Sequence, residues 1–425
     1  MPAGWAVKRL RFLAQVQTGI AKGKDVQGIE TIRVPYLRVA NVQDGFIDID
    51  DVSEIEIAAT DLGRYLLRPG DVLMNEGGDF DKLGRGQVWN GAIDPCIHQN
   101  HVFAVRPHGI EPEWLALVTS ADCGRFFFMT RAKQSTNLAS ISSTNLLELP
   151  VPCPPPAERR AIMRFLDRET GKLDALVAEQ ERLIALLKEK RQAVVSQAVT
   201  KGLDASAHMK DSGVAWLGQV PTHWEVAPLK HLADFINGEA FKPTEWSDDG
   251  TPIIRIQNLN GGDDFNCYNG EVNPRHHVQK GDLLFGWSGN RGTSFGPFVW
   301  PREGLHYLNQ HIFKVEPRGC NVGWFYWCLR AVTIYVEEQA HGIIGMVHVT
   351  KGVLGAIPVP LPPPAEQTAI AAFLDRKTGD IDTLTSEAHR AIALLRERRA
   401  ALVSAAVTGK IDVRGVIAEP AAEAA

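Results

Sequence analysis

The sequence lacks the features that mark a disulfide-stapled, metal-stabilised or membrane protein. Its six cysteines are scattered over 425 residues without a C-x-x-C pair, which argues against a zinc ribbon or a disulfide framework. Its apolar runs fall short of the roughly 18–20 residues that a membrane-spanning helix needs. The N-terminus also lacks the apolar core of a signal peptide. We therefore expect a protein of the reducing cytoplasm with no membrane partner.

The chain also lacks an excess of positive charge. Its formal net charge is −5, so the overall charge gives no indication of a nucleic-acid partner. Hydrophobic residues make up 44% and charged residues 22% of the chain, which is ordinary for a globular protein. The length allows two to four domains.

Catalytic motifs are missing as well. There is no G-x-x-x-x-G-K-[ST] phosphate loop, no H-E-x-x-H and no G-x-G-x-x-G. The Pro-Pro runs follow Cys153 or Leu361 rather than the Asp, Asn or Ser that an amino-methyltransferase of DNA needs. The histidines near His98 and at His276-His277 lack the cysteine or carboxylate spacing of a metal site, so surface hydrogen bonding is their expected role. We expect no catalytic residue, no cofactor and no metal.

What the sequence does contain is an internal repeat. The segment from Pro150 to Asp204 returns 208 positions later as the segment from Pro358 to Asp412, without a gap and with roughly three positions in five identical. This period is far too long for a solenoid unit, so it indicates a duplicated domain plus helix. The chain is therefore expected to be a pseudo-dimer with a pseudo-two-fold internal repeat.

The segments that precede the two copies match only in outline. Both contain the same short landmarks in the same order, such as V-P-Y-L-R-V-A-N-V at 34–42 and T-P-I-I-R-I-Q-N-L at 251–259. Short β-branched runs between Gly-Asp and Asn-Gly turns predict mixed β-rich domains. One further helix is expected in each, over Glu113–Thr130 and Trp324–Gln339, and the acidic stretch Asp44–Glu56 is expected to be a solvated loop or edge.

Each repeat begins with prolines and continues with a helical pattern. In the first copy we expect a short helix to about Asp167 and, after Thr170-Gly171, a longer helix that ends at Lys201-Gly202. A single apolar stripe would favour an ordinary core helix, but two matched stripes can cover each other in an antiparallel, coiled-coil-like pair. About 30 residues of helix would span roughly 45 Å and hold the two domains at opposite ends. The stripes consist of Leu173, Leu176, Val177, Leu183, Ile184, Leu187, Val194 and Ala198, and of Ile381, Leu384, Ile392, Leu395, Leu402 and Ala406.

From residue 4 to about 412, the chain resembles the specificity subunit of type I restriction–modification systems. The resemblance is carried by the paired P-x-P-P-P-A-E…F-L-D-R-x-T…I-A-L-L…R…A-V-T blocks and by D-S-G-V-A-W-L-G-Q-V-P-T-H-W at 211–224. It implies an α+β protein in which two β-rich target-recognition domains are separated by the helical spacer. Each domain would read one half of a bipartite, asymmetric site on double-stranded DNA, and the chain itself would have no catalytic activity.

The resemblance also implies a domain plan and a set of partners. The partners are two methyltransferase subunits, which could supply much of the phosphate neutralisation, and two translocase–nuclease (restriction) subunits. No helix precedes the first domain, so the C-terminal repeat is expected to close the pseudo-symmetric arrangement. The plan comprises recognition domains at 1–149 and 213–357, conserved helical regions at 150–204 and 358–412, a linker at 205–212 and a disordered tail at 413–425.

Candidate DNA contacts are Arg, Lys, Asn, Gln and His side chains in predicted loops and turns, because these residue types bind base edges and phosphates. In the first domain they are Lys22, Lys24, Lys82, Arg85, Gln99, Lys133, Gln134 and Asn137. In the second they are Lys242, Asn260, Arg275, His276, Asn290, Arg291, His341 and Lys351.

Residues that match between the halves are expected to have a different role. Arg38 and Arg255 correspond, as do Asn41 and Asn258, and a reader of sequence should differ where its half-site differs. They are therefore expected to support the scaffold, and the tryptophans at 5, 216 and 224 are expected to be packing anchors. The alternative function is a scaffold protein that holds two partner proteins without recognising DNA. An enzyme in its own right ranks third.

Overall fold

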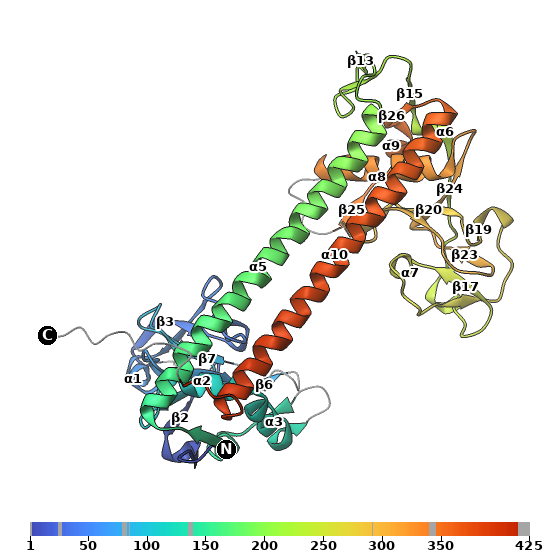
Figure 1. Cartoon of the computed structure of the whole chain (residues 1–425). Coiled ribbons are helices and arrows are strands. Elements are labelled where there is room, and N and C mark those ends of the chain that lie inside the picture. The colour runs from blue at the N-terminus through green and yellow to red at the C-terminus, as the bar shows by residue number, and fades with distance from the viewer. Residues whose placement is uncertain are drawn as a thin grey trace. The chain divides into compact units, whose positions relative to one another are not determined.

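The computed structural model describes residues 2–23, 28–78, 83–84, 86–134, 139–290, 292–339 and 346–414. The chain forms two compact units, Met1–Glu181 with His389–Ala425, and Arg182–Ala388. Two long helices, α5 (Pro156–Lys201) and α10 (Pro364–Val407), each contribute one half to each unit (Figure 1). None of the described helices has the length and apolar character needed to cross a membrane.

The first unit is rich in short strands. Its main sheet has the antiparallel order β2 (Ala14–Thr18), β9 (Val102–Pro107), β5 (Val72–Asn75) and β7 (Gly86–Val88). A second sheet consists of β4 (Ser53–Ala58), β3 (Thr31–Leu37) and β8 (Ile97–His98), with β3 and β8 parallel. The smaller pairings are β1 (Ala6–Arg9) with β12 (Pro150–Cys153), and β10 (Lys133–Gln134) with β11 (Ala139–Ser140) and β6 (Gly77–Gly78). The short helices are α1 (Leu62–Tyr65), α2 (Pro112–Ser120), α3 (Asp122–Arg131) and α4 (Ser143–Leu146).

The second unit repeats this plan. Its main sheet has the antiparallel order β16 (Ala233–Asn237), β24 (Ile312–Pro317), β20 (Leu283–Gly286) and β22 (Gly296–Val299). A second sheet consists of β18 (Cys267–Tyr268), β17 (Thr251–Ile254), β23 (His306–Leu308) and β19 (His277–Val278), with β17 and β23 parallel. The smaller pairings are β15 (Glu225–Pro228) with β26 (Pro358–Leu361), β21 (Ser288–Asn290) with β25 (Met346–His348), and β13 (Met209–Asp211) with β14 (Gln219–Pro221). The short helices are α6 (Leu229–Leu232), α7 (Ile256–Leu259), α8 (Val322–Gln339) and α9 (Lys351–Ala356).

The corresponding main sheets confirm the α+β class and the internal repeat. The order β2-β9-β5-β7 of the first unit becomes β16-β24-β20-β22 in the second, and each second sheet contains one parallel pair. The acidic stretch Asp44–Glu56 ends in β4, an edge strand of its sheet, as expected. Matching strand order with different intervening residues means that one scaffold is built twice.

The helix predicted over Glu113–Thr130 is wrong in one respect, because the structure divides it into α2 and α3. The break lies at Ala121, whose ψ of 160° is extended. The backbone N–H of Asp122 then donates to Ser404 Oγ of α10 at 2.9 Å, so a tertiary contact satisfies this amide at the start of α3. The corresponding helix of the second unit, α8, is continuous and begins two residues before the predicted start.

The predicted division of each repeat into a short and a long helix is also wrong. Helix α5 continues through Thr170-Gly171 for 46 residues, and α10 has 44 residues. The Thr170 hydroxyl donates to the Leu166 carbonyl at 2.7 Å, and Leu166 and Leu173 are buried on either side of the glycine. This burial outweighs the glycine's helix cost of about 1 kcal/mol. At ~1.5 Å per residue the helices span about 69 and 66 Å rather than 45 Å.

The two helices pair antiparallel within each unit. In the first unit, Arg399 Nε donates to Asp174 at 2.9 Å and Arg396 donates to Glu181 at 3.0 Å, so positions rise on α5 as they fall on α10. In the second unit, Arg191 Nε donates to Asp382 at 3.2 Å. The repeat offset of 208 positions relates Asp174 to Asp382 and Arg191 to Arg399, so the same Asp–Arg ion pair occurs once in each unit. Exposed ion pairs contribute about 0–1 kcal/mol each, and their chief effect here is to favour one register.

The predicted apolar stripe is only partly buried. Six of its members have at most 7% exposure: Leu173, Leu187, Ala198, Ile381, Ile392 and Ala406. Three others are solvent-facing, which contradicts the prediction: Leu176 at 50%, Leu183 at 40% and Leu384 at 48%. A two-helix seam covers a narrower face than the stripe read from the sequence.

The C-terminal repeat packs in the first unit, as predicted. Val403 and Val407 of α10 lie in one core cluster with Trp114 of α2. Val413 is 5% exposed in the same cluster, so ordered structure extends past the predicted boundary at 412. Residues 415–425 of the predicted tail lie outside the described residues.

The three tryptophans chosen as anchors are confirmed in that role. Trp5 packs edge-on against Trp114, with centroids 6.4 Å apart. Trp216 Nε1 donates to the Pro358 carbonyl at 3.1 Å. Trp224 is fully buried, and its Nε1 donates to Glu366 at 3.0 Å. Each fixes a strand or linker to a neighbouring element.

Candidate nucleic-acid interface

The matched Arg–Asn pairs form the frame beneath the loops of each domain. Asn41 accepts the Arg38 N–H at 2.9 Å and donates its amide to two loop carbonyls at 3.0 and 2.9 Å. Asn258 accepts the Arg255 N–H at 2.9 Å and donates to two loop carbonyls at 3.1 and 2.9 Å. Both asparagines are 2% exposed. Their hydrogen-bonding groups are used internally, which confirms the predicted scaffold role.

His98 is also structural, which corrects its expected place on the surface. It is fully buried, and its Nδ1 lies 2.6 Å from the Val102 carbonyl. Burial lowers the pKa of His98 to about 4, so the ring is neutral near pH 7. No group of three or more His, Cys, Asp or Glu side chains that could hold a metal ion occurs among the described residues.

Two residues after His98, the turn before β9 carries an exposed polar cluster. His101 Nδ1 lies 3.0 Å from Glu76 Oε2, and Asn100 Nδ2 lies 3.3 Å from His101 Nε2. The backbone fixes this arrangement, because Glu76 N–H donates to the His101 carbonyl and Ile141 N–H donates to the Glu76 carbonyl, both at 2.9 Å. A residue after β5, the turn before β9 and a residue after β11 therefore meet at one place.

The second domain builds the same place with different side chains. Trp287 N–H donates to the His311 carbonyl and Val349 N–H donates to the Trp287 carbonyl, as Glu76 and Ile141 do in the first domain. The Trp287 ring lies 4.7 Å from His348 and 5.6 Å from His311, centroid to centroid. Gln310 Nε2 lies 3.4 Å from His311 Nε2.

The two clusters share a framework and differ in chemistry. The histidine and its preceding amide side chain are common to both, as Asn100-His101 and Gln310-His311. The partner is a carboxylate in the first cluster and an indole with a second imidazole in the second. Hydrogen-bonding and stacking groups of this kind are those that recognise bases. The shared backbone contacts show that Glu76 and Trp287 occupy equivalent positions.

Several predicted contacts lie near these clusters. Lys133 is exposed on β10, in the same small sheet as β6 and β11. Asn290 is exposed at the end of β21, and Lys351 is exposed at the start of α9, three residues after His348. The structure therefore groups these residues although the sequence separates them.

The remaining candidates are distributed more widely. Gln99 is half-buried, and its Oε1 accepts the Val39 N–H at 3.3 Å. His276 Nδ1 lies 3.1 Å from Glu239. Exposed side chains are those of Lys22, Lys242, Asn260 and Arg275. Outside the described residues lie Lys24, Lys82, Arg85, Asn137, Arg291 and His341, and of Gln134 only the backbone is described.

None of the seven cluster residues is among the predicted contacts: Glu76, Asn100, His101, Trp287, Gln310, His311 and His348. Glu76 is acidic and Trp287 aromatic, so a search for basic and amide side chains passes over both. A signal was available for two of them, since aligning the landmarks before β7 and β22 places Glu76 opposite Trp287. His348 has no such signal, because its contact with Trp287 depends on the pairing of β21 with β25.

Comparison with known proteins agrees with this architecture. Residues 221–392 match the family model described as type I restriction modification DNA specificity domain. The chain is 26% identical over 426 residues to the type I restriction enzyme MjaX specificity subunit of Methanocaldococcus jannaschii, covering 97% of this chain and 95% of that protein. It is 28% identical over 210 residues to the EcoBI specificity subunit of Escherichia coli, covering 48% and 43%.

Solved structures share the fold. A chain from a study of complex assembly and conformational transition of the type I R-M system superposes with a TM-score of 0.71 at 18% identity, covering 97% of this chain and 99% of that one. The HsdS subunit from Thermoanaerobacter tengcongensis gives 0.51 at 18% identity, covering 97% and 98%.

Together, the fold and the comparisons make the chain similar to internally duplicated DNA-specificity proteins. The resemblance predicted from the sequence is confirmed. Residues 221–392 are similar to the type I restriction modification DNA specificity domain, and 97% of the chain is similar to a type I specificity subunit.

Proposed function

We propose that the chain is the non-catalytic DNA-recognition subunit of a type I restriction–modification complex, in which each β-rich domain reads one half of a bipartite, asymmetric site. The observation that carries this is the pair of clusters at equivalent positions: Glu76 with His101 in one domain, and Trp287 with His311 and His348 in the other. One scaffold with two different polar surfaces suits two different half-sites.

In this proposal the recognition domains are residues 1–149 and 213–357, and the helical regions are 150–204 and 358–412. The linker 205–212 joins the halves, and its strand β13 pairs with β14 at the start of the second recognition domain. The antiparallel helices set the distance between the half-sites. The exposed candidates Lys22, Lys133, Lys242, Asn260, Arg275, Asn290 and Lys351 contact phosphates or bases beside the two clusters.

We further propose that the helices dock two methyltransferase subunits at two similar surfaces. Leu176 and Leu394 are 50% and 56% exposed in the first unit, and Leu384 and Leu186 are 48% and 53% exposed in the second. Each leucine of the first pair has a repeat mate 208 positions away in the second pair. Exposed leucines at equivalent positions suit two copies of one apolar partner surface. Two translocase–nuclease subunits then join the assembly.

The test is to coexpress the chain with its methyltransferase and map methylated sites in the host genome. Trp287→Glu combined with His348→Ser places first-domain chemistry on the second domain, and it should change one half-site while the other stays unchanged. Exposed Lys280→Ser is the matched control and should leave the site unchanged. Changes in both half-sites would contradict the one-domain, one-half-site proposal. Methylation without any sequence preference would favour the alternative of a protein scaffold.

A further inference from the structure

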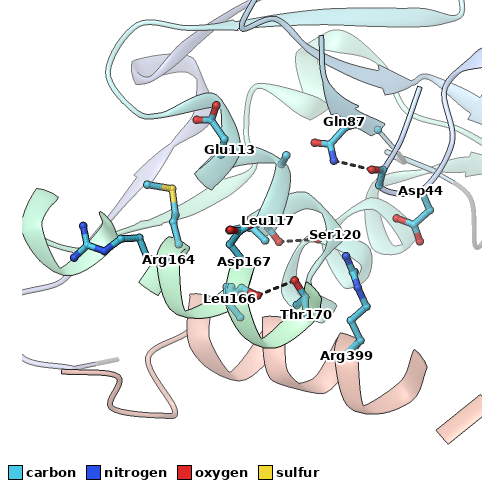
Figure 2. Close-up of a pocket in the computed structure, with 14 residues that line it drawn as sticks. Asp44, Gln87, Glu113, Leu117, Ser120, Arg164, Leu166, Asp167, Thr170 and Arg399 are labelled. Atoms are coloured by element: carbon cyan, nitrogen blue, oxygen red, sulfur yellow. Dashed lines mark hydrogen bonds between the residues drawn. The ribbon is translucent and has the colours of Figure 1, made fainter. Parts of the chain in front are cut away.

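A pocket of about 480 Å³ in the first unit lies where α2 meets the long helices (Figure 2). Leu117 of α2, Asp167 of α5 and Arg399 of α10 are among its lining residues. Asp44 and Gln87 line it from the β-rich part of the unit. The pocket therefore joins a recognition domain to the helices that carry the exposed leucines.

In the second unit, a tryptophan side chain lies between the residues equivalent to Asp167 and Arg399. The repeat relates Asp167 to Asp375 and Arg399 to Arg191, and the buried Trp114 and Trp324 align α2 with α8, so that Leu117 corresponds to Trp327. Trp327 is 3% exposed, and its Nε1 donates to Asp375 at 2.8 Å. The Arg191 guanidinium lies 5.8 Å from the indole centroid, within the range of a cation–π contact.

In the first unit the same surroundings are present without the indole. The Leu117 side chain has no N–H to donate to the carboxylate, and Asp167 is exposed with no hydrogen bond or ion pair to any described residue. Arg399 is held in place because its Nε donates to Asp174, as Arg191 donates to Asp382 in the other unit. An oriented guanidinium and an unpaired carboxylate thus face the pocket.

We propose that this pocket binds the indole of a tryptophan side chain presented by a partner protein, with Nε1–H donating to Asp167 and the ring beside Arg399. The partner is the methyltransferase subunit, so the proposal rests on the proposed function. The pocket and the proposed docking surface lie on the same stretches of the two helices, since Leu176 is six residues after the lining residue Thr170 on α5 and Leu394 is five residues before Arg399 on α10. The second unit fills its own site with Trp327, so the two docking positions are unequal: only the first accepts this side chain.

The first test uses the full chain alone with N-acetyltryptophanamide as the probe, measured by saturation-transfer difference NMR and calorimetry. Wild type is expected to bind one probe per chain, and Leu117→Trp is expected to weaken binding at least ~10-fold because it supplies the indole internally. Asp167→Ala and the N1-methylated probe should each weaken binding by about 10-fold, the effect of losing a hydrogen bond to a charged group. Asp174→Ala should also weaken binding by releasing Arg399.

If Leu117→Trp does not fold, the Asp167→Ala variant and the methylated probe still test the proposal, because Asp167 is exposed and its replacement should not disturb the fold. Trp327→Leu should create a second probe site that needs Asp375, which distinguishes the pocket from general affinity for indole. The pocket proposal is overturned if wild type binds no probe, or if Asp167→Ala binds it as tightly as wild type.

The second test measures assembly with the methyltransferase by native mass spectrometry. Wild type should hold two copies, the first bound more tightly than the second, and Leu117→Trp should weaken the tighter step so that both copies bind with similar affinity. Two copies held with unchanged affinity by Leu117→Trp would refute a methyltransferase tryptophan as the occupant. A wild-type chain that binds the probe but no methyltransferase would instead refute the proposed function and leave the pocket's ligand chemistry intact.

Discussion

If α5 and α10 set the spacing of the half-sites, lengthening both helices should lengthen the DNA gap. The unit boundary offers the insertion points, after Glu181 in α5 and after Ala388 in α10. Repeating residues 175–181 and 382–388 adds one heptad to each helix and preserves the apolar seam. Changing both helices together keeps the ion pairs Asp174–Arg399 and Arg191–Asp382 in register within their units.

The expected magnitude follows from helix and duplex geometry. Seven residues add about 10 Å of helix, equal to roughly three base pairs at ~3.4 Å each. Three base pairs also rotate the second half-site by about 100°, since a turn takes about 10–10.5 base pairs. Three heptads in each helix add about 32 Å, or roughly nine base pairs, which returns the half-site to nearly its original face. The three-heptad variant should therefore recover activity that the one-heptad variant loses.

The assay is methylation of a plasmid library in which the gap between the half-sites is randomised in length. The three-heptad variant should shift the preferred gap by about nine base pairs, and a two-residue insertion in both helices serves as the control. Two residues rotate the stripe by about 200°, so Leu187 and Ile392 should leave the seam and assembly should fail. Full activity at the original gap for the three-heptad variant would refute the ruler.

Four further predictions follow from the described side chains. The purified chain alone should neither methylate nor cleave DNA, and methyl transfer from S-adenosylmethionine by the isolated chain would contradict this. Replacing residues 213–357 with the domain of another specificity subunit should change one half-site only, as read by methylation mapping. Asn258→Ala should lower the free energy of unfolding by about 2–3 kcal/mol because it removes three hydrogen bonds of a buried side chain, whereas exposed Asn260→Ala should have little effect in the same urea titration. The unfolded chain protonates His98 near pH 6.5 but the folded chain only near 4, so stability present above pH 6.5 should fall by about 3 kcal/mol towards pH 4. His98→Gln should lose this pH dependence in denaturation curves, and an unchanged slope would contradict the assignment.

The duplicated scaffold can be predicted from the sequence because each residue of one half can be compared with the corresponding residue of the other half. Asn41 and Asn258 are identical for an internal reason, and the structure shows two buried asparagines that cap loops in the same way. Secondary-structure predictions from short local patterns are less reliable. Thr170-Gly171 reads as a helix break, yet side-chain hydrogen bonding and flanking burial keep α5 continuous. Ala121 reads as helix, because alanine is the best helix former, yet it ends α2.

The clusters were harder to predict because their members are distant in sequence. Glu76 and His101 are 25 positions apart and meet only through the pairing of β5 with β9. Trp287 and His348 meet only through β21 and β25. Neither Glu76 nor Trp287 is basic, so neither is selected as a candidate DNA contact by residue type. Only the strand register shows that these two side chains lie beside the histidines.

The two halves of the chain act as a mutational comparison within one molecule. Where both halves keep the same residue, as in Asp174–Arg399 and Asp382–Arg191, the contact is the same and its role is structural. Where the halves differ on an exposed cluster, the difference suits two DNA half-sites. Leu117 and Trp327 belong to neither group, because they differ at a site whose surroundings are kept. A kept carboxylate and a kept arginine around a missing ring favour a ring supplied from outside, which is why this difference points to a partner protein rather than to DNA.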